Sequence, residues 1–165
     1  MIVIIPMQSQ RALPQRIIDV YEAQSEKAEI VTIGVPSQKS KAIRLFEAKT
    51  RHVCNMVLSG CSDGVVCMSD SDCLHLVRTN LEEAKNEISC NPQLGGVAFS
   101  QNDIDNLEQA HVDIKSFVIR SELLKLVDWL SPTVKMCLCY KIKEVLQKNG
   151  FLFRYIDCRK RIMAI

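Results

Sequence analysis

Short apolar runs bounded by glycine, proline and acidic residues divide the chain and predict its β-strands. The first run, MIVIIP, is continuous and stops at Pro6, which is typical of a buried strand in a parallel or mixed sheet. The run EIVTI ends before Gly34, and the run VVCMS leads directly into Asp70. Further strands are predicted at residues 97–99, 112–119 and 151–156.

Apolar residues at helical spacing predict helices between these strands. A first helix follows Pro14, with Ile17, Ile18 and Tyr21 on one face. Further helices are predicted over residues 41–58, 74–88, 121 to about 130, and 136–148.

Local signals set the ends of these elements. Ser121 is expected to cap the helix that it begins, and Asn149 with Gly150 is expected to end the last helix. The polar residues 101–109 are expected to form a loop or a short helix. Because strands and helices alternate, the pattern predicts an α/β fold in which right-handed crossovers join parallel strands.

Length and composition restrict the class of protein. With 165 residues and no internal repeat, residues 1–165 are expected to form a single domain. A net charge of +2, with only residues 159–161 locally basic, gives no indication of nucleic-acid binding. No apolar run approaches the roughly 20 residues that span a bilayer, and MIVIIP is too short for a secretory signal. We therefore expect a cytoplasmic protein without a transmembrane segment.

The cysteines are expected to be reduced thiols. There are eight of them, and none belongs to a C-x-x-C pair that would indicate a zinc site or a redox motif. Cys67 lies in a predicted buried strand, where a thiol behaves as a small hydrophobic group.

Asp70 and Asp72 form the strongest candidate for chemistry. Residues two apart in extended chain point to the same side, so both carboxylates are expected to face one spot. Two adjacent carboxylates repel each other unless a cation lies between them, and oxygen ligands suit Mg²⁺ or Mn²⁺. The alternative is a polar turn, in which aspartate and serine are common.

The order and spacing of these features resemble the GT-A fold glycosyltransferases of the broad family 2 type, across most of the chain. In that family a first strand ends in proline, as in VIIPMQS, and a D-x-D follows a later strand. The family register places Asn55 at a helix asparagine that precedes the D-x-D. Cys54 stands where an arginine is expected, and Arg51 lies one turn earlier on the same helical face.

The resemblance continues toward the C-terminus. Gly95, Gly96 and Val97 are similar to the strand that supports the acceptor side in these enzymes, and Gly150 fits a later family glycine. Two family features are missing. The acidic pair that supplies the general base in inverting members falls on Leu138 and Cys139. At the end of the second strand, Ser37 and Gln38 are the nearby polar residues where an aspartate usually reads the base.

The resemblance implies a three-layer α/β/α domain with a mixed, mostly parallel sheet, and a site for a nucleotide-sugar donor such as a UDP- or GDP-sugar. Asp72 would bind Mn²⁺ or Mg²⁺, and Asp70 would hold the ribose or share the metal. Such ligands bind beyond the carboxyl ends of the strands in open α/β sheets. The residues expected on the nucleotide side are Pro6, Gln8, Ser37, Arg51 and Asn55.

The sequence offers several candidates for the general base and for the third metal ligand. Asp113, Asp103 or Asp105 can reach the site from the loop region, and Asp128 beside Trp129 is a further candidate. A third metal ligand can come from His111 or His75, although a lone histidine is more often structural.

Three functions compete. The first is a glycosyltransferase that moves a sugar from a nucleotide donor to an unknown acceptor. Such an enzyme would use a general base other than the family's acidic pair, or would transfer the sugar with retention of its anomeric configuration. The second is a noncatalytic nucleotide-sugar-binding module of the same fold. The third is a nucleotidyltransferase, against which the chain lacks a glycine-rich, basic loop after the first strand.

Overall fold

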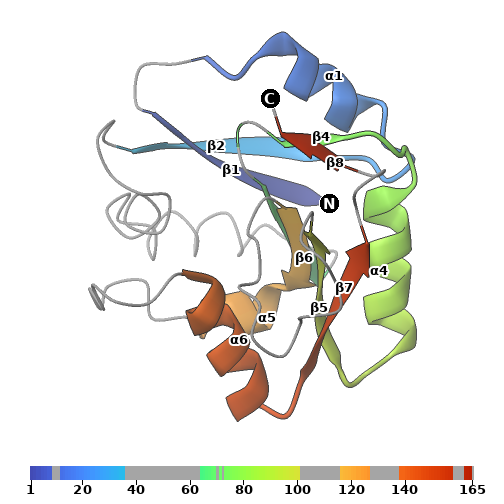
Figure 1. Cartoon of the computed structure of the whole chain (residues 1–165), viewed down its shortest axis with the longest axis vertical. Coiled ribbons are helices and arrows are strands. Elements are labelled where there is room, and N and C mark those ends of the chain that lie inside the picture. The colour runs from blue at the N-terminus through green and yellow to red at the C-terminus, as the bar shows by residue number, and fades with distance from the viewer. Residues whose placement is uncertain are drawn as a thin grey trace.

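The protein folds around a six-stranded mixed sheet. The computed structural model describes residues 1–8, 12–35, 64–69, 71, 73–100, 116–126, 138–157 and 162–164. The strands lie in the order β2-β1-β3-β6-β5-β7, and β6 alone among them runs antiparallel to its neighbours (Figure 1). Their bounds are Ile2–Gln8 (β1), Glu29–Val35 (β2), Val65–Ser69 (β3), Leu94–Ser100 (β5), Ser116–Arg120 (β6) and Leu152–Asp157 (β7).

Helices cover both faces of the sheet and give a three-layer α/β/α arrangement. In Figure 1, α4 lies on one side of β5, β6 and β7, and α5 and α6 lie on the other. The described helices are α1 (Gln15–Glu22), α4 (Asn80–Cys90), α5 (Ser121–Lys125) and α6 (Leu138–Lys148). The expected fold class is therefore confirmed.

Strands β1, β3, β5 and β6 are buried on both faces because their alternate residues enter different cores. One core joins Val3, Ile5 and Cys67 of the sheet to α1 and α4. Its helix residues are Ile17, Tyr21, Leu81, Ala84 and Ile88. The residues between those sheet positions, such as Ile4 and Met68, are also buried, as are Leu124 and Leu146 in the helices of the opposite layer. This double burial explains why these four strands are largely continuous apolar runs in the sequence.

A second, two-stranded sheet corrects one predicted helix. Residues 74–88 were expected to be a single helix, but Cys73–His75 forms strand β4, and α4 starts only at Asn80. Strand β4 pairs antiparallel with β8, Ile162–Ala164, which the sequence pattern does not reveal. All three residues of β4 are buried, because the small sheet packs beside α1. Pairing with a distant segment therefore outweighs the local helical spacing of Leu74.

Gly150 ends α6 as the sequence predicts. Its φ angle is +75°, a conformation that is easily adopted only by glycine. The backbone N–H of Phe151 donates to the carbonyl of Leu146, and the N–H of Gly150 donates to that of Gln147. This pair of hydrogen bonds is the Schellman motif, which turns the chain directly from α6 into β7.

The remaining predicted elements are present where the structure describes them, but several of their ends differ. Helix α5 ends at Lys125, with Leu126 as its C-cap, short of the predicted end near residue 130. Strand β2 runs through Gly34 to Val35, two residues beyond its predicted end, and β5 begins at Leu94, so its two glycines lie inside the strand. Ser121 starts α5 but makes no side-chain capping hydrogen bond; the cap position is Arg120. The predicted helix over residues 41–58 and the loop over residues 101–109 lie outside the described residues.

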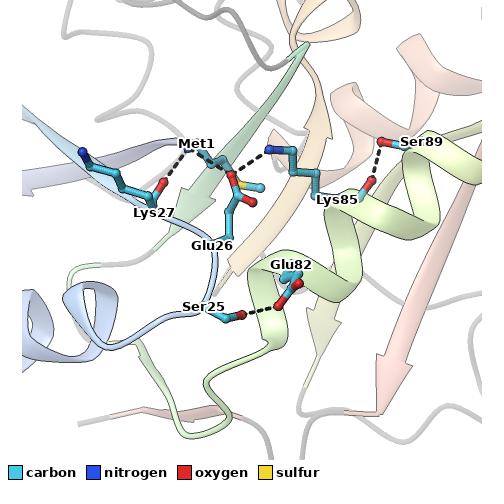
Figure 2. A network of polar contacts seen from close by, with 7 residues as sticks. All are labelled: Met1, Ser25, Glu26, Lys27, Glu82, Lys85 and Ser89. Atoms are coloured by element: carbon cyan, nitrogen blue, oxygen red, sulfur yellow. Dashed lines mark hydrogen bonds and ion pairs between the residues drawn. The ribbon is translucent and has the colours of Figure 1, made fainter.

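A polar network fastens the start of β1 to α4, as Figure 2 shows. Glu26 accepts a contact from the Met1 amino group at 3.4 Å and from Nζ of Lys85 at 2.7 Å. The same amino group donates to the backbone carbonyl of Lys27 at 2.6 Å. Ser25, one residue before Glu26, donates to Glu82 on α4. The turn between α1 and β2 is thus held against α4.

The helices of the described residues are too short or too polar for any of them to span a bilayer.

Candidate functional site

The carboxyl ends of β1, β2 and β3 lie at the same edge of the sheet. These three strands are parallel neighbours, with Gln8 opposite Val35 and Ile4 opposite Met68. The backbones of Pro6 and Gln8, both expected on the nucleotide side, belong to the last residues of β1 at this end. In open α/β sheets this is where ligands bind.

The D-x-D follows β3 at this edge of the sheet. Strand β3 ends at Ser69 and β4 begins at Cys73, so only three residues join two buried strands. Ser71 is described as a half-buried turn residue. Asp70 and Asp72 themselves lie outside the described residues, so the face that their carboxylates share stays a prediction.

Eight further candidate residues predicted from the sequence also lie outside the described part of the chain. They are Ser37, Arg51, Asn55, Asp103, Asp105, His111, Asp113 and Asp128. Within the ranges that the structure does describe, there is no group of three histidine, cysteine or acidic residues that could hold a metal ion. The pair of aspartates stays the donor set predicted from the sequence, and its oxygen atoms suit Mn²⁺ or Mg²⁺.

His75 is a structural residue in this fold. Its Nε2 lies 2.8 Å from Oγ of Ser116, and its Nδ1 lies 3.0 Å from the side-chain nitrogen of Asn80. Both ring nitrogens are thus engaged by other side chains, which leaves neither for a metal ion. Burial lowers the pKa of His75 from 6.5 to about 4, so the ring is neutral at physiological pH.

Ser116 links His75 to the strand that precedes the D-x-D. In the ladder between β3 and β6, Ser116 stands opposite Ser69. Its Oγ also lies 3.6 Å from Sγ of Cys67, two residues back along β3. Burial raises the pKa of the Cys67 thiol to about 12, so this sulfur stays protonated.

Aromatic rings enclose this polar group. The ring of Phe99 meets His75 edge to face with centroids 5.1 Å apart, and the ring of Tyr21 lies 5.5 Å away on α1. The Tyr21 hydroxyl is buried without a hydrogen-bond partner among the described residues, and burial is the largest cause that raises its pKa well above 10. The sequence does not reveal this cluster because its members are distributed over six elements.

The structure shows where the two residues that replace the family's acidic pair lie. Helix α6 begins at Leu138 and, as described, carries no acidic residue in its first turn. Since α6 turns tightly into β7 and packs against it, the start of the helix lies toward the carboxyl end of that strand. Residues 138 and 139, on which the resemblance places the acidic pair, therefore lie toward the carboxyl end of β7 and are leucine and cysteine.

Comparisons with solved structures identify the fold. A mannosyltransferase from Pyrobaculum calidifontis, solved with GDP-Man and Mn²⁺, superposes with a TM-score of 0.69 at 16% identity, covering 96% of this chain and 55% of that one. Glucosyl-3-phosphoglycerate synthase from Mycobacterium tuberculosis, solved with Mn²⁺, UDP and glucosyl-3-phosphoglycerate, gives 0.53 at 12%, covering 93% and 68%.

A nucleotidyltransferase is also similar. CMP:2-keto-3-deoxy-manno-octonic acid synthetase, solved with CTP, gives a TM-score of 0.53 at 14% identity, covering 94% of this chain and 88% of that one. Neither the comparison with protein-family models nor that with curated proteins finds a match. Identities this low establish a common fold, and the chain spans little more than half of the mannosyltransferase. The protein therefore has the fold of the GT-A nucleotide-sugar transferases, as the resemblance in its sequence predicted.

Proposed function

We propose that this protein is a glycosyltransferase that moves a sugar from a nucleotide-diphosphate donor to an acceptor, with a divalent metal bound by its D-x-D. One observation carries the proposal. The connection that contains Asp70 and Asp72 leaves the carboxyl end of β3, beside the ends of β1 and β2, in a sheet of GT-A topology. Neighbours of this fold were solved with GDP-Man or UDP together with Mn²⁺, which supports the same class of donor here.

In this proposal Asp72 binds Mn²⁺ or Mg²⁺, and Asp70 holds the ribose or shares the metal. The bound ion would supply positive charge that stabilises the diphosphate leaving group. Pro6, Gln8, Ser37, Arg51 and Asn55 form the nucleotide side, and His111 is the candidate for a third ligand. The whole of residues 1–165 would act as one catalytic domain.

The base that deprotonates the acceptor is the least constrained part. Asp113 and Asp128 are the proposed candidates, since Leu138 and Cys139 cannot accept a proton at neutral pH. If neither is needed, the enzyme retains configuration or the domain binds its nucleotide-sugar without turnover.

Calorimetry with UDP, GDP and their sugars, with and without Mn²⁺, tests the proposal. We expect binding of one nucleotide that depends on Mn²⁺, and the loss of that dependence in Asp72→Asn and Asp70→Asn. Ser71→Ala, which keeps both carboxylates, is the matched control and should bind as the wild type does. Metal-independent binding, or equal affinity in the aspartate variants and the wild type, would contradict the D-x-D assignment.

Turnover separates the candidate functions. Release of the nucleoside diphosphate from the sugar donor in the presence of Mn²⁺ supports a transferase, and binding without release supports a noncatalytic module. The similarity to the CTP-bound synthetase keeps nucleotidyl transfer as a second candidate. In that case CTP or another nucleoside triphosphate would bind in place of the nucleotide-sugar, and pyrophosphate would be released.

A further inference from the structure

Ser69 and His75 flank the short connection that contains the D-x-D. Strand β3 ends at Ser69, residues 70–72 follow, and β4 runs from Cys73 to His75. Both ends of this segment contact the same residue, because Ser116 faces Ser69 in the ladder and lies 2.8 Å from Nε2 of His75. The two carboxylates therefore belong to a connection whose ends are fixed relative to each other.

The hydrogen bonds around His75 have one consistent direction. The amide nitrogen of Asn80 donates to Nδ1 of His75, so the ring proton lies on Nε2 and is donated to Oγ of Ser116. The Ser116 hydroxyl is then left to donate toward Sγ of Cys67. In a chain of this kind each group fixes the orientation of the next.

Complete burial makes this orientation hard to lose. Cys67, Asn80 and Ser116 have no exposed surface, and His75 is 3% exposed. A buried donor or acceptor that loses its partner keeps the full cost of its desolvation, so the four side chains favour a single arrangement. Ring contacts with Tyr21 and Phe99 and the pairing of His75 with Ile162 in β8 add to this restraint.

We propose that His75 is a positioning residue for the metal site, which holds the D-x-D connection in the geometry that metal and diphosphate require by fastening β4 to Ser116. The inference rests on the proposed function. It assigns His75 no contact with the metal, because both of its ring nitrogens are already engaged. Groups that orient metal ligands from behind commonly affect metal affinity by about 10-fold to 100-fold when removed.

The test measures Mn²⁺ affinity by calorimetry in the presence of whichever of UDP or GDP the wild type binds. His75→Leu removes both ring hydrogen bonds, and we expect its Mn²⁺ affinity to fall by about 10-fold. His75→Gln can place an amide nitrogen near the Nε2 position, so it should recover part of that affinity. Ser116→Ala removes the hydroxyl that bonds to Nε2 of His75. Its Mn²⁺ affinity tests the positioning role if His75→Leu does not fold.

A matched control separates positioning from stability. Ile88→Val lies in the same core but on α4, away from the D-x-D connection, and lowers stability by loss of one buried methyl group. Thermal unfolding without metal ranks all variants by stability. We expect Ile88→Val to keep the wild-type Mn²⁺ affinity although it is less stable.

Each result has a distinct meaning. Unchanged Mn²⁺ affinity in both His75→Leu and Ser116→Ala would overturn the positioning role, as would a loss in Ile88→Val that matches its loss of stability. If the wild type itself binds neither UDP nor GDP with Mn²⁺, the proposed function is wrong and the inference falls with it. A loss confined to the His75 and Ser116 variants, with partial recovery in His75→Gln, supports it.

Discussion

Nε2 of His75 lies 2.8 Å from Oγ of Ser116, although 41 positions separate the two residues in the chain. The bond joins the short strand that follows the D-x-D to the strand that pairs with β3. A polar contact at the centre of an otherwise apolar core is specific, because each partner needs the other to remain satisfied.

This burial predicts an acid-dependent loss of stability. The pKa of His75 is about 4 in the folded protein and near 6.5 in the unfolded chain. Between these pH values the unfolded chain binds more protons than the folded protein does, so the free energy of unfolding rises with pH. The stability that the neutral imidazole contributes is therefore lost as the pH falls through this window. From pH 7.5 to pH 5 we expect this residue to remove about 2 kcal/mol of stability.

Urea unfolding at several pH values measures this effect. Carboxylates also titrate toward the acid end, so the wild type is compared with His75→Gln, which cannot take up the proton. The difference between the two proteins should change by about 2 kcal/mol between pH 7.5 and pH 5. A constant difference would show that the imidazole is not buried as a neutral group. The groups that face the ring are Tyr21, Asn80, Phe99 and Ser116.

Gly95→Ala should destabilise the fold by steric overlap. The pairing of β5 with β7 is irregular at this residue, and an added Cβ would overlap Cδ2 of Leu146 and lie 2.9 Å from Cβ of Phe151. We expect a loss of about 1–3 kcal/mol, as overpacking usually costs. Gly150→Ala is the contrast, because no atom lies within 4 Å of its Cβ and only the positive φ is strained.

Chemical denaturation of both glycine variants compares the two causes. Gly150→Ala should lose about 1 kcal/mol, the cost of placing a side chain in the left-handed region. If Gly95→Ala is as stable as the wild type, α6 does not pack against β5 as closely as described.

Arg120 should contribute more to stability than an exposed arginine of the same sheet. Its guanidinium donates to the backbone carbonyls of Ile88, Asn91 and Leu94, which fastens the end of α4 to the start of β5. Arg120→Met leaves these carbonyls without their donor and should cost about 1–3 kcal/mol.

Arg154→Met is the matched control for that substitution. Arg154 pairs with Glu87 at 3.1 Å, but its side chain is 61% exposed, so solvent screening limits the pair to less than about 1 kcal/mol. Urea midpoints of the two variants give the comparison. Equal losses would contradict the role assigned to the backbone contacts of Arg120.

Thiol reactivity should differ sharply among the described cysteines. Cys67 and Cys73 are buried, and burial raises the pKa of Cys67 to about 12, whereas Cys90 is exposed at the end of α4. At pH 8, iodoacetamide should label Cys90 in the folded protein and reach Cys67 and Cys73 only when urea is added. Peptide mass spectrometry assigns the sites. Labelling of Cys67 at the rate of Cys90 would contradict a folded core of this form.

Local signals in the sequence were sufficient for most elements. The apolar run before Asp70 predicted β3 with its bounds, because a strand that is buried on both faces requires apolar residues at successive positions. Gly150 predicted the end of α6, because a left-handed turn favours glycine. The helix expected over residues 74–88 was wrong at its start, because β4 exists only through its pairing with β8, almost ninety residues further along the chain.

The sequence by itself determined the α/β class, the position of the D-x-D after a buried strand, and the lack of an acidic pair at residues 138 and 139. These features depend on periodicity and on the chemistry of single residues. Only the tertiary structure decided that β6 runs antiparallel beside β3, and that His75 is engaged through both ring nitrogens. Its partners come from other elements, and no local pattern records which distant groups a buried imidazole will meet.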